Sequence, residues 1–520
     1  MLEMSRISFD WLERRNQLSP HKEALRDLHT GRRYTYSELN DRANRLANGF
    51  RQEWGVRKGD RVSILAHNCT EYLEALFAAA KLGAILAPVN IRLMGPELSY
   101  IFNDCEPKGL IMGEDFLKII SEIRDDIKIS NYLLLDDAKG GGMIPYERFL
   151  DDADARAPEL EEEISLDDPH VILYTSGTTG HPKGAIHTHG KIFFNSVNAN
   201  IGLDIVSTDV NLCALPLFHT GGLHVMTTPT LHAGGTVVVM RAFDPGEALK
   251  IIHNKDINTV FFVATQWLFM HQHEDFESTD FSGLRLAWTG GAPCPLNVLE
   301  AYQEKGVPFR QGYGLTEVGP DAMMLSAEDA VRKVGSIGLP PFHSAMRIVD
   351  ADDQDVPPGE VGELIFRGPT VTPGYWNNLE ATSEALRNGW FHTGDLAYMD
   401  EEGYVFLVDR KKDMYLSGGE NVYPAEVEKA LYGHPKIAEL AIFGIPHEKW
   451  GEVGHAVVVA KPGETITEEA VIKFLQGKLA KYKIPKSVSF MDELPRTPAG
   501  KVLKRTLREP YWEGQDKRIH

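Results

Sequence analysis

A segment rich in glycine and hydroxyl residues, YTSGTTGHPKGA from Tyr174 to Ala185, constrains the fold of this chain more than any other feature. The apolar run from His170 to Tyr174 predicts a short buried strand before it, and Thr188 predicts a helix cap after it. Glycines allow backbone N–H groups to converge, hydroxyls add donors, and Lys183 adds a positive charge. Such a loop suits a polyphosphate. It is not a Walker A loop, because no Gly-Lys-Ser/Thr triplet stands at the required spacing.

The length and charge of the chain bound its organisation. A chain of 520 residues exceeds the size of one growing core, so two or more domains are expected. The net charge of −20 argues against a nucleic-acid partner. Residues 411–520 nevertheless carry 18 Lys and Arg against 15 Asp and Glu. A basic end on an acidic body suggests that this end meets an anionic ligand.

The localisation is predicted from the most apolar segment, the N-terminus and the cysteines. The most apolar stretch, residues 75–90, contains Lys81, so no membrane span is expected. The N-terminus shows no basic-then-apolar signal pattern. Four widely spaced cysteines without a CxxC pair are typical of reduced thiols in a cytoplasmic protein. The sequence leaves open whether the protein forms a homodimer.

Alternating helical and strand patterns predict an α/β fold. Residues 37–54 and 70–82 have helical periodicity, whereas residues 61–66 and 84–89 are apolar strand candidates. Continuous apolar strands joined by helices indicate mostly parallel sheets covered by helices on both faces. After about residue 339 short β segments and turns predict a small β subdomain, residues 340–409.

We place the domain boundary near Arg410–Lys412, where a charged segment precedes a new unit. This gives a large N-terminal domain, residues 1–410, and a small α+β C-terminal domain, residues 411–520. The C-terminal unit is expected to contain helices at 424–433 and 468–479 and strands at 439–444, 456–460 and 487–491.

Further motifs carry chemistry. In QGYGLTE, residues 311–317, the glycines beside Tyr313 would let a flat base lie against its ring, and Thr316 and Glu317 offer oxygens suited to Mg²⁺ near phosphates. The alternative is a strand that ends in a turn with a solvated Glu317. In Thr393-Gly-Asp395 the carboxylate suits ribose hydroxyls.

Two candidates are ambiguous on their own. His219, in PLFHTGGL, is as a lone histidine near apolar residues more often structural than functional. Lys501, in PRTPAGK, would also occur in a basic tail without a function.

Together these segments resemble the adenylate-forming superfamily of acyl- and aryl-CoA synthetases, luciferases and peptide-synthetase adenylation domains. The similarity runs from about Phe9 to Leu507. Its motifs stand in the family's order: YTSGTTGHPKGA, QGYGLTE, TGD, DRKKD with SGGENVYPAEVE, and PRTPAGK. The glycine-rich SGGENVYPAEVE segment is most similar to the fatty-acyl and aryl-CoA ligase branch.

The resemblance implies an ATP site built from several segments. Its residues are Thr175, Ser176, Gly177, Thr178, Thr179, Gly180 and Lys183 at the phosphates, Gly290, Gly291 and Ala292 between adenine and acyl group, Gln311, Gly312, Tyr313, Gly314 and Thr316 at the adenine and α-phosphate, and Asp395 and Arg410 at the ribose. Glu317 and Thr175 are the implied Mg²⁺ ligands and catalytic residues.

The C-terminal domain is implied to act in both half-reactions. The resemblance makes Lys501 the catalytic lysine, Lys412 the hinge, and Gly418 and Gly419 the lining of the thiol tunnel. The resemblance also implies that His219 guards the entry of the acyl group and the thiol. Lysines, Mg²⁺ and loop N–H groups would offset the repulsion between a carboxylate and the α-phosphate.

The implied function is a cytoplasmic, ATP- and Mg²⁺-dependent ligase that joins a carboxylic acid to coenzyme A. Alternatives are an adenylating enzyme with another acceptor (a carrier-protein thiol or an amine), a non-catalytic nucleotide-binding protein, and a luciferase-like activity for which no residue speaks. The resemblance implies these acyl-pocket candidates: His219, His224, Phe262, Trp288, Gly290, Gly314 and Leu315. They include no lysine or arginine, which disfavours a dicarboxylate, whereas a fatty acid and a cinnamate- or benzoate-like acid both remain.

Overall fold

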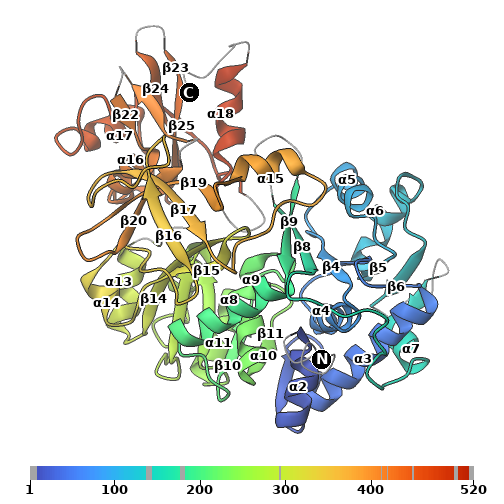
Figure 1. Ribbon diagram of the computed structural model, residues 1–520. Helices are drawn as coiled ribbons and strands as arrows, with labels where there is room; N and C mark the ends of the chain where they lie inside the picture. The colour runs from blue at the N-terminus through green and yellow to red at the C-terminus, as the bar shows by residue number, and fades with distance from the viewer. Residues whose placement is uncertain are drawn as a thin grey trace. The chain divides into compact units, whose positions relative to one another are not determined.

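The computed structural model describes residues 9–135, 143–175, 182–291, 294, 296–410, 413–417, 420–447, 450–496 and 502–513. It divides into two compact units (Figure 1). Unit 1 contains residues 1–334, 338–345 and 366–391, and unit 2 contains residues 335–337, 346–365 and 392–520. The predicted boundary at 410–412 stays a prediction, because residues 411 and 412 lie outside the described residues.

A seven-stranded sheet of unit 1 has the strand order β7-β6-β5-β3-β4-β8-β9. Its pairs are parallel except for β8 and β9, which are antiparallel. The strands are β3 (Arg61–Leu65), β4 (Ile85–Pro88), β5 (Gly109–Met112), β6 (Asn131–Leu134), β7 (Ile144–Pro145), β8 (Pro169–Thr175) and β9 (Lys183–Thr188).

Helices cover both faces of this sheet (Figure 1). On one face Val62 and Ile64 pack with helices α3 and α4, and on the other Leu65 packs with α5 and α6. This alternation follows from the two-residue period of a strand. The helices are α3 (Tyr36–Glu53), α4 (Glu71–Leu82), α5 (Gly95–Cys105), α6 (Leu117–Glu122) and α7 (Tyr146–Asp151), with 3₁₀ turns η1 (Glu114–Phe116) and η2 (Arg124–Asp126).

An eight-stranded sheet of unit 1 has the order β15-β14-β13-β12-β10-β11-β1-β2. Its strands are β1 (Glu23–Asp27), β2 (Arg33–Thr35), β10 (Val210–Cys213), β11 (Thr236–Val239), β12 (Thr259–Val263), β13 (Leu286–Gly290), β14 (Phe309–Leu315) and β15 (Gly319–Met324). The inner strands are parallel, whereas β2 and β15 pair antiparallel at the two edges.

The helices of this second layer also lie on two faces. Val237 and Val239 share a core with α4 and α10, whereas Val238 packs with α11, α12 and α13. The remaining helices of unit 1 are α2 (Trp11–Leu18), α8 (His189–Gly202), α9 (Thr220–His224), α10 (Thr227–Ala233), α11 (Pro245–His253), α12 (Ala264–His271), α13 (Leu296–Glu304), α14 (Asp329–Arg332) and α15 (Leu379–Ala385).

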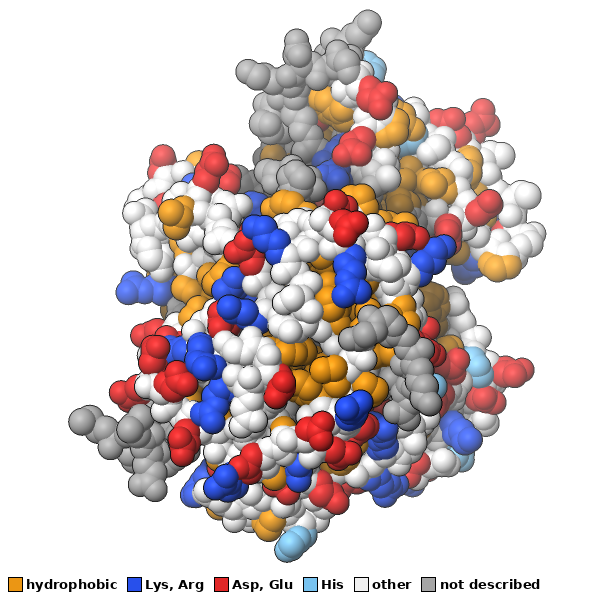
Figure 2. All heavy atoms as spheres, turned by 90° about the vertical axis from the view of Figure 1, so that its right-hand side faces the viewer, with side chains coloured by type: hydrophobic (Ala, Val, Ile, Leu, Met, Phe, Trp, Pro, Cys, Tyr) orange, Lys and Arg blue, Asp and Glu red, His pale blue; other side chains and the backbone are white. Residues whose placement is uncertain are grey.

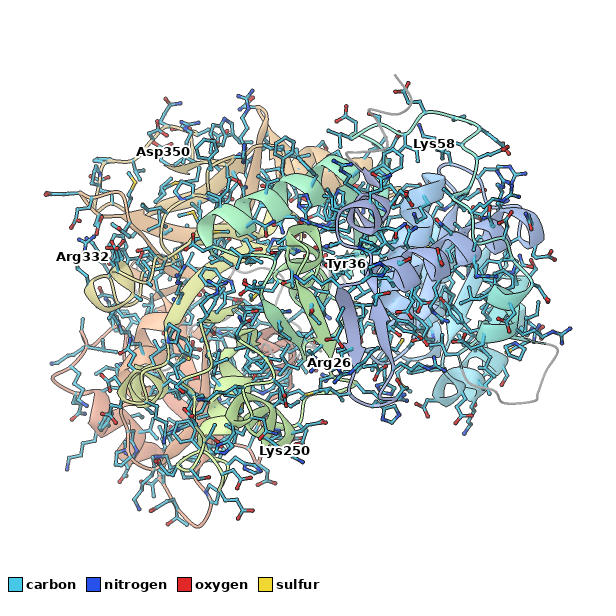
Figure 3. All side chains as sticks on the ribbon, turned by 90° about the horizontal axis from the view of Figure 1, so that it is seen from below. Arg26, Tyr36, Lys58, Lys250, Arg332 and Asp350 are labelled. Atoms are coloured by element: carbon cyan, nitrogen blue, oxygen red, sulfur yellow. The ribbon has the colours of Figure 1, made fainter. Side chains whose placement is uncertain are left out.

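Tyr36, labelled in Figure 3, links helix α3 to the end of helix α10. It is the first residue of α3, which Thr35 caps with Glu38 in a reciprocal capping box. The Tyr36 hydroxyl donates to the carbonyl of Gly235 at 2.6 Å and to that of Leu231 at 3.3 Å. A buried hydroxyl needs such partners, so this side chain fixes α3 against the end of α10.

Unit 2 is built around two sheets. One sheet joins β16 (Ala345–Val349), β17 (Gly362–Arg367), β19 (Trp390–Met399) and β18 (Leu386–Arg387), with β20 (Val405–Arg410) on β19, and the division between the units passes through it. The other contains β21 (Tyr415–Ser417), β22 (Glu420–Val422), β23 (Ile437–His447), β24 (Gly451–Ala460) and β25 (Ser487–Phe490). In this second sheet β25 pairs parallel with β24, whereas the other pairs among the described residues are antiparallel. Its helices are α16 (Pro424–Tyr432), α17 (Glu468–Leu475) and α18 (Lys504–Trp512).

Most expected elements are confirmed, with shifts at their ends. The helix expected at 37–54 is α3, and the one expected at 424–433 is α16. Thr188 caps α8, since its side chain accepts the N–H of Lys191. Among the described residues, no helix combines the length and apolarity needed to cross a membrane. On the face drawn in Figure 2, acidic and basic side chains alternate rather than gather by sign.

Candidate active site

Strands β8 and β9 hold the two ends of the predicted phosphate loop together. Thr175, the last residue of β8, is paired with Lys183, the first residue of β9, and the Thr175 hydroxyl donates to the Lys183 carbonyl at 3.3 Å. The Tyr174 hydroxyl donates to Asp104 Oδ2 at 2.6 Å, which anchors β8 to α5. The predicted residues 176–180 lie outside the described residues.

Glu317 lies in the turn between β14 and β15, and both its carboxylate and its carbonyl are held. Its Oε1 accepts a hydrogen bond from the Tyr375 hydroxyl at 3.0 Å. Its carbonyl accepts from Lys191 Nζ at 3.0 Å and from the Thr372 N–H at 2.6 Å. Lys183 Nζ lies 5.4 Å from the centroid of the Tyr375 ring. Two residues predicted from separate motifs, Lys183 and Glu317, are therefore joined through Tyr375.

Five buried polar side chains continue inward from Glu317, and we call them the Lys191 cluster: Lys191, Asn195, His187, His224 and Asp321. The Asn195 amide donates to the His224 carbonyl at 2.8 Å and lies 3.5 Å from Asp321 Oδ2. The rings of His187 and His224 stack with centroids 5.3 Å apart. Lys191 also donates to the Thr370 carbonyl.

Burial sets the charge states in this cluster. It lowers the pKa of Lys191 to about 7, although the Glu317 charge opposes that shift, and it lowers the pKa of His224 to about 3. It raises the pKa of Asp321 well above its usual range, against hydrogen bonds from Asn195 and Trp288. His224 is therefore neutral near pH 7, and burial favours the protonated form of Asp321. Among the described residues, His187 Nε2, His224 Nε2 and Asp321 Oδ1 have no hydrogen-bond partner.

Strand β14 carries the residues predicted to face adenine. The sequence predicts a strand at 308–310 that ends before the motif, but β14 continues through Leu315 because β15 returns to pair with it. Tyr313 is buried, and its ring lies nearly parallel to that of Phe366, with centroids 6.2 Å apart. Thr316 follows the strand and is also buried.

Position 312 must be glycine because the Trp288 side chain lies directly beside it. A Cβ at this position would lie 2.1 Å from Cζ2 of Trp288, so the indole occupies the space that any side chain would need. Gly314 is equally constrained, because its Cβ would lie 2.1 Å from the Pro320 carbonyl oxygen. The glycines of this motif thus let Trp288 and β15 approach the backbone of β14.

The candidates on β12 and β13 divide between two faces of the sheet. Phe261 pairs with Trp288, and Val263 pairs with Gly290, so these four share one face. Phe262 lies on the opposite face, fully buried against Phe243 and Trp267 in the core. This placement favours Phe261 over Phe262 as an acyl-pocket residue. Gly291, beyond the strand, has φ +80°, a conformation that favours glycine.

His219 caps a short helix beside that face. Its Nδ1 accepts the N–H of Gly221 at 3.0 Å, so the proton of the neutral ring is on Nε2. A Cβ on Gly221 would lie 3.6 Å from Phe261 Cε1, which places the His219 turn next to Phe261. His224, at the other end of α9, has its Nδ1 3.2 Å from Thr228 Oγ1 and belongs to the buried cluster.

In unit 2, the predicted ribose residues are adjacent on two strands. Asp395 on β19 is buried and is paired in register with Arg410, the last residue of β20. Gly394 has φ +68°, and its N–H donates to Glu363 Oε1 at 3.1 Å. The remaining predicted residues lie outside the described residues: Ala292, Lys412, Gly418, Gly419 and Lys501.

The donors present fit a magnesium ion held mainly by phosphates. Among the described residues, no three His, Cys, Asp or Glu side chains gather as a metal cage. Mg²⁺ is commonly held by one or two carboxylates together with substrate phosphates and water. Glu317 supplies one such carboxylate, and Tyr375 occupies only one of its oxygens.

Sequence reasoning missed several residues of this site. Strand alternation could have pointed to Phe261, since its neighbour Phe262 must face the other way. Asp321 could have been noticed as a charge within a buried run of β15. Tyr375 and Lys191 gave no signal, because only the fold brings them to Glu317.

Comparisons with known proteins assign the family. Residues 12–376 match the family model described as AMP-binding enzyme, and residues 426–501 match the AMP-binding enzyme C-terminal domain. The chain belongs to the AMP-binding enzyme family. This enzyme is 42% identical to a feruloyl-CoA synthase of an Amycolatopsis species over 96% of its own length and 98% of the relative's.

Other relatives agree. An indoleacetate–CoA ligase of Aromatoleum aromaticum is 41% identical, with 96% of this chain and 97% of the relative covered. The ATP-bound crystal structure of MatB from Rhodopseudomonas palustris has a TM-score of 0.89 at 32% identity, covering 98% of this chain and 99% of that one. The predicted fold class and the prediction of an acid–CoA ligase of the adenylate-forming family are confirmed. The alternatives with another acceptor or without catalysis are not favoured.

Proposed function

We propose that this AMP-binding enzyme forms an acyl-adenylate from a carboxylic acid and ATP and then transfers the acyl group to coenzyme A. The observation that carries the proposal is the convergence of Lys183, Tyr375 and Glu317 beside the paired ends of the phosphate loop. It brings a cation, a hydroxyl and a carboxylate from three segments to one place. CoA-ligase relatives at 41–42% identity support the acceptor.

In the first half-reaction a carboxylate oxygen attacks the α-phosphorus of ATP, and pyrophosphate leaves. Lys183 would neutralise phosphate charge, and the Thr175 hydroxyl at the end of β8 would exchange its bond to the Lys183 carbonyl for one to the same phosphate. Glu317 would hold Mg²⁺, which supplies positive charge to the phosphates when bound. Tyr375, by donating to Glu317, would orient its carboxylate. Lys501 would enter from the C-terminal domain to offset the anionic charge that develops.

In the second half-reaction the thiolate of CoA attacks the acyl carbon, and AMP leaves. Gly418 and Gly419 would line the thiol path, and Asp395 and Arg410 would hold the ribose. His219 would act through Nε2–H as a hydrogen-bond donor at the acyl entry, because Nδ1 is already an acceptor. The proposed domains are residues 1–410 and 411–520, with Lys412 as the hinge between the two half-reactions.

The proposed acid has an apolar or aromatic body. Trp288 and Phe261 supply apolar aromatic side chains on one sheet face, Gly290 lies on the same face, and Gly312 admits the Trp288 indole. The proposed location is the cytoplasm, supported by four cysteines that are all free thiols.

The two half-reactions test the proposal separately, by pyrophosphate exchange and by thioester formation from synthetic acyl-adenylate. Lys501→Ala should lose adenylation but still transfer a supplied acyl-adenylate to CoA. Lys412→Pro should do the reverse, because proline fixes φ near −65° at the hinge. Lys461→Ala, at an exposed position, and Lys412→Ala, which does not fix φ, are the matched controls. If folded Lys501→Ala lost both half-reactions equally, the division of labour would be wrong.

A further inference from the structure

The Asp321 carboxyl on β15 is buried without a complete set of partners. Asp321 is only 2% exposed. One of its carboxyl oxygens, Oδ2, lies 3.5 Å from the Asn195 amide nitrogen, which is long for a hydrogen bond. The Trp288 indole also hydrogen bonds to the carboxyl. Among the described residues, Oδ1 has no partner. The proposed mechanism leaves this group unused.

Such a group costs stability unless a ligand satisfies it. An unmet hydrogen bond of a buried polar atom costs about 1–3 kcal/mol, and native proteins contain few of them. Burial raises the pKa of the carboxyl well above its usual range, which favours the protonated form. A protonated carboxyl offers both an O–H donor and acceptor oxygens. Asp321 can therefore bind a neutral polar group, whereas it would not attract a cation.

Its surroundings are those of the proposed acyl site. Trp288, which bonds to Asp321, shares a sheet face with Phe261 and Gly290. On the same face the indole fills the space beside Gly312. Phe261 in turn lies next to the turn that begins at His219. Two aromatic side chains thus lie next to one buried hydrogen-bonding group.

We propose that Asp321 hydrogen bonds to a hydroxyl group on the acyl body, so that the preferred substrate is a hydroxylated aromatic acid. An aromatic ring matches the flat surfaces of Trp288 and Phe261, and its hydroxyl completes the hydrogen bonding of Oδ1. A saturated fatty acid would leave Oδ1 buried and unpaired. Sites built to bind a substrate hydroxyl discriminate strongly against analogues that lack it. This inference rests on the proposed function and names the substrate class of the same site.

The test compares acids that differ by one hydroxyl. Thioester formation with CoA is measured for 4-hydroxycinnamate, 3-hydroxycinnamate, cinnamate and octanoate, and kcat/KM is compared. The wild type should favour one of the hydroxycinnamates over cinnamate by at least ~10-fold. In Asp321→Leu that ratio should fall to about 1–2 because the hydrogen-bonding group is gone, mainly through activity toward the hydroxylated acid. Asp321→Asn, which still donates and accepts, should keep most of the preference.

Thr289→Val is the matched control. Thr289 is buried on β13, its hydroxyl is also unpartnered among the described residues, and it lies on the opposite sheet face from Trp288. Its variant should leave the ratio unchanged. An equal ratio in wild type and Asp321→Leu, or a wild type that prefers cinnamate or octanoate, would overturn the inference while leaving the ligase function intact. A wild type that forms no thioester from any of these acids would instead contradict the proposed function.

Discussion

The Lys191 cluster and a second buried polar group of unit 1 hold their ionisable side chains in different ways. The second group, which we call the Arg42 cluster, consists of Arg42, Glu74, Tyr146 and Glu147. Arg42 donates to Glu74 at 2.8 Å and forms two hydrogen bonds of 2.9 Å with Glu147. The Tyr146 hydroxyl donates to the other oxygen of Glu74 at 2.8 Å. Each carboxylate oxygen of this cluster thus accepts a strong hydrogen bond.

The contrast distinguishes a cluster that stabilises the fold from one that we expect to serve function. In the Arg42 cluster three helices, α3, α4 and α7, each contribute a side chain, and the paired charges fix how those helices pack. In the Lys191 cluster, polar atoms of His187, His224 and Asp321 remain unpartnered among the described residues. Incomplete hydrogen bonding in a buried network calls for further partners, such as a ligand or a buried water.

The largest expected effect is on stability, from Arg42→Met. Removing the guanidinium leaves the fully buried Glu74 without its cation, which should cost about 3–5 kcal/mol. Thermal and urea unfolding measure the loss, with exposed Arg14→Met as the control. Adenylation by the remaining folded enzyme should be unchanged at a permissive temperature. Lost catalysis with normal stability would place this cluster in the active site and remove the contrast.

Glu317→Gln should give the next largest effect, on catalysis alone. The amide keeps an oxygen for the Tyr375 hydroxyl but loses the charge that would bind Mg²⁺. Pyrophosphate exchange should fall about 100-fold or more, as when one key electrostatic contact is removed. Unfolding should shift by less than ~0.5 kcal/mol. The assay is a Mg²⁺ titration, with exposed Glu328→Gln for comparison; wild-type turnover at limiting Mg²⁺ would rule out the metal assignment.

Lys191→Met should reveal a pH-dependent effect. The pKa of Lys191 is about 7 in the folded enzyme and near its reference value of 10.5 in the unfolded chain. Between these values the unfolded state binds more protons, so wild-type stability should rise with pH relative to the variant. The difference in unfolding free energy should grow by on the order of 1 kcal/mol per pH unit. Urea unfolding at pH 7, 8 and 9 measures it, and parallel curves would mean that Lys191 is fully charged in the fold.

Tyr375→Phe should have the smallest effect. It removes one hydrogen bond to Glu317 and leaves the ring beside Lys183. A bond of this kind to a charged group contributes about 1.5 kcal/mol, so adenylation should fall roughly 10-fold. The apparent Mg²⁺ affinity should weaken in parallel, whereas Tyr482→Phe, at an exposed position, should change neither. An unaltered Mg²⁺ dependence would show that Tyr375 does not orient Glu317.

The sequence predicted the elements better than their contacts. Helix α3 has strong apolar periodicity and a capping box, and both α3 and α4 were predicted within a residue or two at each end. The extension of β14 was not predicted, because strand pairing with β15 is a non-local contact. Glu317 was found through its motif, but its partner Tyr375 is 58 residues away. A motif shows functional residues that are close in sequence. It does not show partners that only folding brings together.

The pairing of Thr175 with Lys183 has a consequence for the length of the phosphate loop. Seven residues, 176–182, connect two positions that the strands fix across one rung of an antiparallel ladder. The entropy of closing a segment grows slowly with its length, so one inserted residue adds only about 0.1 kcal/mol. Folding therefore places almost no limit on how long this loop can be. The proposed phosphate contacts limit its length more strictly than folding does. A single inserted glycine should therefore leave an enzyme that unfolds normally but no longer binds ATP.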